Sequence, residues 1–386
     1  MVSRTDRGIV ADWWWTVDKP LLAALVTLMV GGVVLSLAGS PPVAERLGLE
    51  TFFFFKRHVL FFIPALAVLF AASFLDARQA RRLAIVLFLV MAALMLATLM
   101  IGEEIKGARR WINFGPLSIQ PSEFMKPAFV VLAAWLMSEN TRQAQIPGKI
   151  FAFLLFGVVG ALLIAQPDFG QTLLVGTAWA ALFFLAGMPL LWIVAIGLGG
   201  VGAATVAYMT VPHVAGRIDR FFNPQEHDTF QVDTALESFL RGGWLGSGPG
   251  EGTIKKILPD SHTDFIFAAA AEEFGVVLCI ALTLLFAFVV LRGLLHALRL
   301  SDSFSRLAVA GLVIVFGIQS VINMAVNLSL MPAKGMTLPF ISYGGSSMLA
   351  VALEMGLLLA LTRRRPEQQS LLRGMAAVRG AAVRAG

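Results

Sequence analysis

The chain is short of charge. Only 14% of its 386 residues are Asp, Glu, Lys or Arg, against roughly a quarter in an average soluble domain, and 58% are hydrophobic. The mean hydropathy is +0.79, and apolar runs long enough to cross a bilayer recur along the whole chain. These features exclude an ordinary soluble protein and predict a polytopic helical membrane protein.

Other chemistry is also missing. Cysteine is limited to Cys279, so an internal disulfide is excluded. No His and Cys residues have the spacing of a zinc site, and the glycine-rich segment 242–252 lacks the flanking strand and helix of a P-loop. The sequence pI is about 9.8, but the basic residues lie in short loops and tails between apolar runs. We therefore expect neither a nucleic-acid partner nor an organic cofactor.

We predict an all-α membrane domain over residues 20–362. Its ten transmembrane helices are expected at 20–40, 52–75, 83–101, 120–138, 150–166, 171–187, 190–210, 264–291, 306–330 and 344–362. A large extracytoplasmic loop, about 211–263, separates spans seven and eight. The segment 1–19 precedes the domain, and a basic tail, 363–386, follows it. The tail either rests on anionic lipid as a disordered chain or binds a partner.

Arginine and lysine predict the orientation. Ten spans place both termini on one side, and that side carries more than half of the 30 Lys and Arg but only a third of the 24 Asp and Glu. Cytoplasmic loops carry such an excess of positive charge. Both termini are therefore predicted to be cytoplasmic, with the 211–263 loop outside.

The most informative segment is 258–275, where the long polar loop runs into an apolar helix. A carboxylate at the edge of a bilayer loses part of its hydration, which is costly unless the group has a function. Asp264 is therefore interpreted as the central catalytic residue. The alternative is a first-turn residue favoured by the helix dipole. On one helix Glu272 would lie about 12 Å deeper, as a substrate contact or, with Glu273, in a structural ion pair. His262 is either a base or an interfacial hydrogen-bonding residue.

Residues 103–126 carry a second set of candidates. Arg109 and Arg110 beside Trp111 suit phosphate recognition, with an interfacial anchor as the alternative. Glu123 and Lys126 are i,i+3 partners at the start of the 120–138 helix. A charged pair so close to an apolar run is costly unless it faces a polar cavity.

A third set follows Asn323 and Asn327. Residues 332–347 are rich in Pro and Gly and predict irregular backbone, which at membrane depth is buried in protein or lines a cavity. Lys334 is the cation of this loop. Ser346 opens the last span, where it either binds a phosphate or caps the helix. In the short turn 166–171, Asp168 is more typical of a turn or cap residue than of a catalyst.

Five segments together resemble a known family. They are GARRWI (107–112), QPSEFMK (120–126), QPDFG (166–170), HTDFIF (262–267) and LPFISYGGSS (338–347). In this order, over nearly the whole chain, they resemble the SEDS family (shape, elongation, division and sporulation). The segments KGMTLP (334–339) and GSGPGEGTIKK (246–256) are more similar to the division member than to the elongation member. PDS at 259–261 and residues 237–243 depart from the commoner family pattern.

The resemblance implies an enzyme that polymerises lipid II into glycan strands at the outer face of the inner (cytoplasmic) membrane, at the division septum. A class B penicillin-binding protein and other division proteins would be its partners, within membrane lipid. The family's essential aspartate falls on Asp264, which would act as general base towards the acceptor 4-hydroxyl. Open alternatives are a lipid II flippase and a non-catalytic division scaffold; an ion-coupled transporter would often show related halves, which the sequence lacks.

The other candidate residues would stabilise the leaving group and bind the substrate. The leaving diphosphate needs positive charge, for which Arg109, Arg110, Lys126, Arg217 and Lys334 are candidates. A divalent cation, Mg²⁺ or Mn²⁺, would be an addition, with Asp264 or Glu104 as its oxygen ligand. The full set of substrate-binding candidates is Arg109, Arg110, Trp111, Glu123, Lys126, Arg217, His262, Glu272, Lys334 and Ser346.

Overall fold

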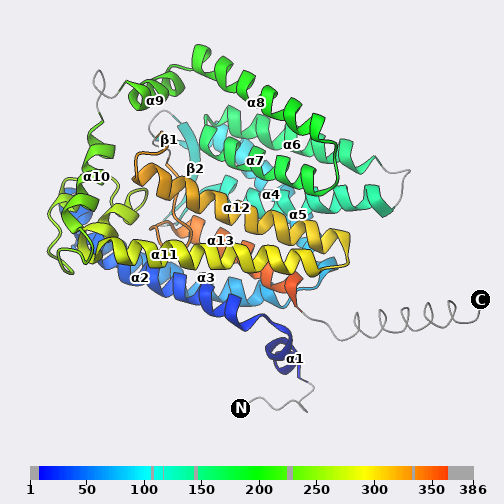
Figure 1. Cartoon of the computed structure of the whole chain (residues 1–386), viewed down its shortest axis with the longest axis horizontal. Helices are drawn as coiled ribbons and strands as arrows, with labels where there is room; N and C mark the ends of the chain where they lie inside the picture. Colours follow the sequence, from blue (N-terminus) through cyan, green and yellow to red (C-terminus); the bar gives the residue numbers. More distant parts are fainter. Residues whose placement is uncertain are drawn as a thin grey trace, which may run out of the picture.

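The computed structural model describes residues 8–105, 108–115, 117–142, 147–223, 229–332 and 335–363. Long helices run roughly along one axis and form a bundle, with short helices and turns at one end (Figure 1). The helix α1 and the end of the helix α13 lie at the opposite end. The fold therefore separates two polar ends by a helical body.

The elements follow the chain in a simple order. They are α1 (Ile9–Thr16), α2 (Lys19–Arg46), α3 (Phe53–Ser73), α4 (Ala77–Ile101), β1 (Glu103–Ile105), β2 (Ala108–Phe114), β3 (Leu117–Ile119), α5 (Pro121–Arg142), α6 (Gly148–Ala165), α7 (Phe169–Leu185), α8 (Leu190–Thr210), α9 (Pro212–Phe222), α10 (Phe230–Gly242), the 3₁₀ helix η1 (Ile254–Lys256), α11 (Ile266–Arg299), α12 (Ser303–Asn327) and α13 (Gly345–Thr362).

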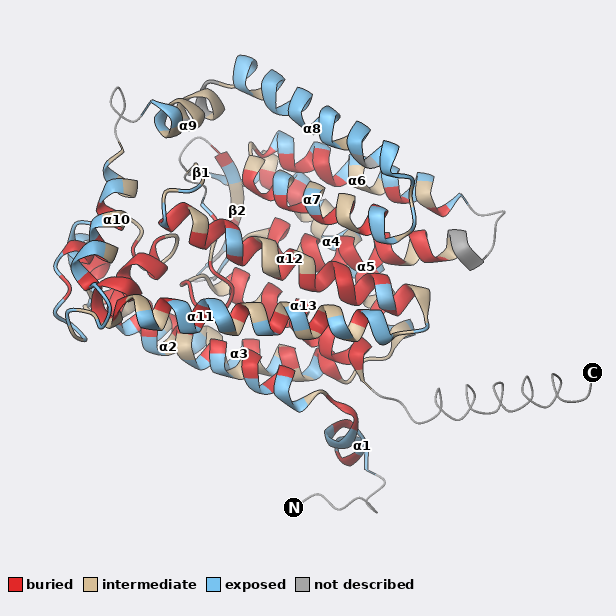
Figure 2. Cartoon of the chain, viewed as in Figure 1, coloured by how far each residue is buried: buried red, intermediate tan, exposed pale blue. Residues whose placement is uncertain are grey.

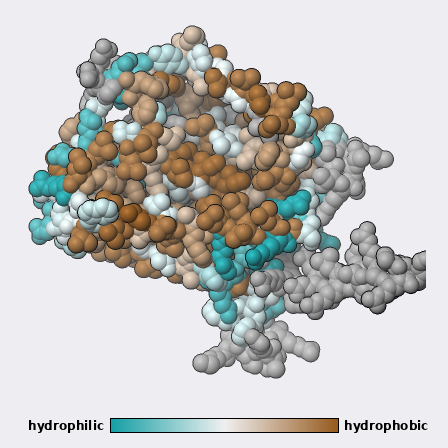
Figure 3. All heavy atoms as spheres, in the orientation of Figure 1, coloured by the Kyte–Doolittle hydropathy of each residue, from teal (hydrophilic) through white to brown (hydrophobic). Residues whose placement is uncertain are grey.

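A long helix covers each predicted span. Within the described residues, eight are long and apolar enough to cross a membrane, namely α2, α3, α4, α6, α8, α11, α12 and α13. The helix α7 is apolar but has 17 residues, and α5 has 22 residues but carries charged and polar side chains at both ends. The chain is thus a polytopic membrane protein with about eight candidate spans. The visible face agrees, because hydrophobic atoms cover its middle and hydrophilic atoms gather towards the ends (Figure 3).

The bundle is enclosed around three helices. The helices α5, α12 and α13 are largely buried, whereas α8 is exposed along its most apolar stretch and lies at the edge of the bundle (Figure 2). Gly311 lets α12 approach its neighbours closely, because an added Cβ would lie 2.6 Å from Val130 Cγ1 of α5. The interior therefore consists of helices buried on most sides, with lipid-facing helices around them.

A small antiparallel sheet between α4 and α5 was not predicted from the sequence. Its order is β1-β2-β3, with Glu104 opposite Arg109 and Ile112 opposite Ile119. Ala108 and Ile112 face the protein, and Arg109 faces outward, as the alternation of a strand requires. Runs this short give almost no periodic signal, so a prediction based on long apolar runs overlooks them.

Asp18 ties the start of α2 to the end of α11. Its Oδ1 accepts the Leu21 N–H at 2.8 Å as an N-cap. Arg292 donates to both carboxylate oxygens at 2.7 and 2.8 Å, and His296 Nε2 lies 2.7 Å from Oδ2. Burial opposes the charged form of Asp18, but the bonds from His296, Arg292 and Leu21 outweigh it and hold the pKa of Asp18 below its usual 3.8.

Replacing Asp18 by Ala should lower the free energy of unfolding by about 1–3 kcal/mol, because the cap and the charged hydrogen bonds are lost together. Thermal unfolding of the purified protein in detergent measures this. Since the folded-state pKa is depressed, the contribution is complete above the unfolded value of 3.8 and is lost as the pH falls further. Asp18→Asn keeps an acceptor for the cap and should lose less. A wild-type melting temperature for Asp18→Ala would contradict the assignment.

Candidate active site

Asp264 lies in a turn just before α11. The helix begins at Ile266, so Asp264 is not on the helical stripe with Glu272 that the sequence predicted. The Asp260 carbonyl accepts N–H bonds from Thr263 (3.0 Å) and Phe265 (3.2 Å), and Asp260 has a φ of 52°. These bonds close the turn and leave the Asp264 side chain partly exposed beside the helix start.

Two buried asparagines hold the backbone of this turn. Asn323 and Asn327, one helical turn apart on α12, each donate from Nδ2 to the Asp264 carbonyl, at 3.0 and 2.9 Å. Asn327 Oδ1 also accepts the N–H of Ala268 at 3.0 Å. Asn323 donates in addition to the Met336 carbonyl at 2.7 Å. One face of α12 thus fixes Asp264, the first turn of α11 and the 335–344 loop together.

The 335–344 loop packs on the same turn. Ser342 Oγ donates to the Thr263 carbonyl at 2.6 Å, and the Tyr343 N–H donates to the His262 carbonyl at 2.9 Å. A Cβ built on Gly335 would lie 3.5 Å from Asp264 Oδ2, so the carboxylate faces this loop. Lys334, the predicted cation of the loop, lies outside the described residues.

His262 is packed among aromatic rings. Its ring centroid lies 4.3 Å from that of Phe54 and 5.6 Å from that of Tyr343. Burial lowers the pKa of His262 to about 4; Asp260 opposes this shift and Arg46 adds to it. The imidazole is therefore neutral at physiological pH. It packs the Asp264 turn against the end of α2 and the start of α3, and it supplies no positive charge for a phosphate.

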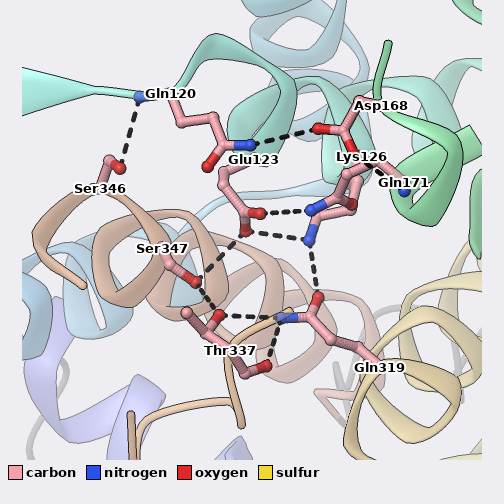
Figure 4. A network of polar contacts seen from close by, with 9 residues as sticks. All are labelled: Gln120, Glu123, Lys126, Asp168, Gln171, Gln319, Thr337, Ser346 and Ser347. Atoms are coloured by element: carbon pink, nitrogen blue, oxygen red, sulfur yellow. Dashed lines mark hydrogen bonds and ion pairs between the residues drawn. The ribbon is translucent and has the colours of Figure 1, made fainter. Parts of the chain in front are cut away.

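Glu123 and Lys126 belong to a buried polar network that joins four helices (Figure 4). Lys126 Nζ lies 2.9 Å from Glu123 Oε2 and donates to Gln319 Oε1 at 2.6 Å. Gln171 Nε2 donates to Glu123 Oε1 at 2.6 Å, and Ser347 Oγ donates to Glu123 Oε2 at 3.3 Å. Lys126 is only 1% exposed. The pair is satisfied inside the protein, which a buried ion pair requires.

This network extends in two directions, to the 335–344 loop and to Gln120 at the end of the sheet. Gln319 Nε2 donates to the Thr337 carbonyl at 3.0 Å, so the network reaches the 335–344 loop. On its other side Gln120 Nε2 donates to Asp168 Oδ2 at 3.4 Å, and the Gln120 N–H donates to Ser346 Oγ at 3.4 Å. Asp168 accepts the Gln171 N–H as the N-cap of α7, which confirms its interpretation as a cap residue.

The two adjacent arginines have different surroundings. Arg110 donates to the Gln166 and Pro167 carbonyls, and its Nη1 lies 3.6 Å from Asp168 Oδ1. Arg109 is exposed on β2 and lies 3.5 Å from Glu104 on β1. Trp111, on the same strand, is partly buried. Arg110 therefore holds the turn between α6 and α7, and Arg109 presents its charge at the surface.

Glu272 holds a loop of the chain. Its two carboxylate oxygens accept the N–H groups of Thr253 (2.6 Å), Ile254 (2.7 Å) and Lys255 (2.8 Å), and the residue is 0% exposed. Glu273 pairs with the buried Lys255, whose Nζ also donates to the Ala38 carbonyl at 3.2 Å. Glu273 thus forms the structural ion pair, with Lys255 as a cation that was not predicted, and Glu272 is structural through backbone N–H groups rather than through an ion pair.

The remaining candidates do not meet at Asp264 in the described part of the chain. Arg217 is on α9, and its side chain lies outside the description. Among the described residues, no group of three or more His, Cys, Asp or Glu side chains could hold a metal ion. The roles of Asn323 and Asn327 were not predicted from the sequence. Two amides spaced i,i+4 in an apolar helix were the available signal.

Known proteins resemble the chain over nearly its whole length. The family of cell cycle proteins FtsW/RodA/SpoVE matches residues 19–367. A Caulobacter vibrioides protein named "Probable peptidoglycan glycosyltransferase FtsW" is 47% identical over 367 residues, covering 94% of each chain.

Solved structures share the fold. A chain of a peptidoglycan synthase complex, in a structure on the coordination of polymerization and crosslinking, superposes with a TM-score of 0.74 at 27% identity, over 90% of this chain and 98% of that one. The rod shape determining protein RodA of Thermus thermophilus gives 0.66 at 27% identity, over 90% and 97%. The SEDS resemblance is thus confirmed, and the chain belongs to the FtsW/RodA/SpoVE family of cell cycle proteins.

Proposed function

We propose that the protein is a peptidoglycan glycosyltransferase that polymerises lipid II at the outer face of the cytoplasmic membrane during cell division, with Asp264 as general base. The observation that carries this proposal is the clamp on Asp264: its carbonyl is held by two buried amides while its carboxylate faces the 335–344 loop. A fixed backbone with a partly exposed carboxylate is the arrangement that proton transfer to a catalytic base requires.

The reaction joins an acceptor sugar to an anomeric carbon that carries a polyprenyl diphosphate. Asp264 takes the proton of the acceptor 4-hydroxyl as the oxygen attacks. Displacement in one inverting step needs no covalent sugar–enzyme species, in analogy with inverting glycosidases. The diphosphate leaves with its negative charge, which a positioned cation stabilises.

The surroundings of the basic side chains show which of them could bind the leaving diphosphate. Lys126 and Arg110 are engaged inside the protein, which disfavours them. Arg109 lies at the surface of the sheet, and with Trp111 it remains the best described candidate. Arg217 and Lys334 remain candidates from the sequence alone, as does Ser346, whose hydroxyl already accepts the Gln120 N–H.

Asp264 and Glu104 are the two candidate ligands for a divalent cation, Mg²⁺ or Mn²⁺. Mg²⁺ is commonly held by one or two carboxylates together with phosphate oxygens of the substrate, and Asp264 could supply one such oxygen. Glu104, on the exposed sheet 3.5 Å from Arg109, could supply another. The ion would neutralise charge on the leaving diphosphate, and the chain's own task remains to hold the Asp264 turn.

We infer ten spans with both termini in the cytoplasm. The helix α5 measures about 33 Å at about 1.5 Å per residue, enough for a bilayer core of roughly 30 Å. Its Glu123 and Lys126 neutralise each other within the bundle, as charged groups at membrane depth must be. The end of the bundle that bears Arg292 and Arg363 would face the cytoplasm, and Asp264 would face outward.

The similar complex supports a crosslinking partner. The structure named above concerns a peptidoglycan synthase complex that coordinates polymerization and crosslinking. We therefore propose a class B penicillin-binding protein as partner at the septum, with other division proteins. A flippase is disfavoured, because the described charges Glu123 and Lys126 are bonded to each other and to neighbouring side chains rather than lining an open polar route.

Replacing Asp264 by Ala or Asn should lower lipid II polymerisation by about 10² to 10⁴-fold, since general base catalysis contributes about this much. Gel analysis of glycan strands made by the purified protein with its transpeptidase measures this, with and without a chelator. Expression and partner binding should not change. Wild-type polymerisation by Asp264→Ala would end the assignment, and a scaffold would tolerate the change.

Replacing Asn323 by Ala should lower kcat more than it raises KM, because the Asp264 and Met336 carbonyls lose a donor and the base loses its position. Steady-state polymerisation kinetics separate the two constants. Ser320→Ala is a matched control: it is also buried on α12, but its hydroxyl bonds only within the helix, to the Phe316 carbonyl. Equal kinetics for both variants would contradict the clamp.

A further inference from the structure

The helix α11 is broken at Gly275, and an outer loop fills the break. Gly275 has φ 79° and ψ 174°, which ends the regular helical bonding there. The Val276 N–H donates to the Gly243 carbonyl at 2.9 Å, and the Val277 N–H donates to the Trp244 carbonyl at 3.2 Å. A Cβ on Gly275 would lie 2.2 Å from the Trp244 oxygen, so only glycine fits.

The same loop also bonds to α11 on the N-terminal side of the break. Ser247 and Gly248 donate their N–H groups to the carbonyls of Glu272 (2.8 Å) and Glu273 (3.1 Å). Backbone bonds on both sides of the break therefore fix the 243–248 segment to α11. Because these bonds use backbone groups only, they leave the side chains at the tip of the loop to face outward.

Those side chains are large and apolar. Leu240 is 83% exposed, Trp244 71% and Leu245 81%. We call Leu240, Trp244 and Leu245 the apolar tip; Arg241, between them in sequence, is also exposed. In the same region Lys256 is polar and exposed, and the adjacent Ile257 is half-exposed. Three large apolar side chains so close together on a soluble surface would be unusual, and such a patch indicates contact with another apolar phase.

The apolar tip is continuous with the lipid-facing surface of α11. Beyond the break, Val277, Ile280 and Leu284 are exposed at spacings of three and four residues, one stripe of a helix. The Trp244 carbonyl bonds to Val277, the first residue of this stripe. The tip and the stripe therefore form one apolar surface, of which the stripe faces the hydrocarbon.

The depth of the tip follows from the length of α11. From Val277 to Arg299, the last residue of α11, the helix rises about 33 Å at about 1.5 Å per residue. The hydrocarbon core of a bilayer is about 30 Å thick. With Arg299 at one boundary, Val277 and the apolar tip lie at the other, where tryptophan is enriched in membrane proteins.

We propose that the apolar tip inserts into the leaflet on the Asp264 side and binds the acyl chains and interface of membrane phospholipid. The lipid surface is the occupant because the tip continues a surface that already faces lipid. This inference depends on the membrane-spanning arrangement and not on the chemistry at Asp264. Loss of Asp264 activity and failure of the tip to insert are therefore separate outcomes.

Spin labels at single cysteines test the proposal. In a Cys279→Ser background, which removes the one native cysteine, Trp244→Cys and Leu245→Cys carry a nitroxide in protein reconstituted into phospholipid nanodiscs. Collision with oxygen, which concentrates in lipid, is compared with collision with a water-soluble nickel chelate. Ile280→Cys is the reference for lipid and Lys256→Cys the reference for water.

We expect both tip labels to resemble Ile280→Cys, with oxygen collisions several-fold above nickel collisions. A ratio like that of Lys256→Cys would overturn the proposal, because the tip would then lie in water. Low collision with both reagents would overturn it as well, since the tip would be covered by protein. The altered side chains are exposed, so the fold should persist, and melting of each variant checks this.

Discussion

Polar groups at membrane depth must find their partners inside the protein, and the whole structure depends on this constraint. The Asp264 carbonyl lies in a turn before α11, outside the regular hydrogen bonding of a helix. Asn323 and Asn327 satisfy it from the neighbouring helix α12. The same pair reaches Ala268 and Met336. The bonds that satisfy the Asp264 carbonyl therefore also position the Asp264 carboxylate.

The same constraint explains the two glutamates of α11 and the Glu123–Lys126 pair. Glu272 is satisfied by three amides of the 253–255 segment, and Glu273 by Lys255. Lys126 shares its donors between Glu123 and Gln319. Each buried charge joins segments that are distant in sequence. Glu272 and Glu273 therefore hold the 253–255 segment against α11, and the Glu123–Lys126 pair joins α5 to α7 and α12.

Much of the helical framework could be predicted from the sequence, because a span must be a continuous apolar helix. The segment 190–210 was predicted with the observed bounds of α8, and the start of α11 differed by two residues. The break at Gly275 and the sheet β1–β3 could not be predicted in this way. The break depends on backbone partners in the 243–248 segment, about thirty residues earlier, and the strands of the sheet are too short to give a periodic signal.

In the candidate site, too, some features could be predicted from the sequence and others could not. The position of Asp264 at the edge of an apolar run was visible in the sequence, as was the likelihood of a polar turn at Asp168. The sequence did not show which basic side chains bond inside the protein and which face outward. Arg109 and Arg110 are adjacent and point to opposite faces of β2. Only the register of the sheet separates them. His262 likewise required the structure, since its neutral state results from its burial among Phe54 and Tyr343.

The most direct measurement for the central claim is the structure of the protein with its transpeptidase and a non-reactive lipid II analogue in the acceptor position. The account predicts that a carboxylate oxygen of Asp264 lies about 2.6–3.2 Å from the acceptor 4-hydroxyl, or one water away, with the Asn323 and Asn327 bonds intact. An acceptor hydroxyl bound to another side chain, far from Asp264, would contradict it.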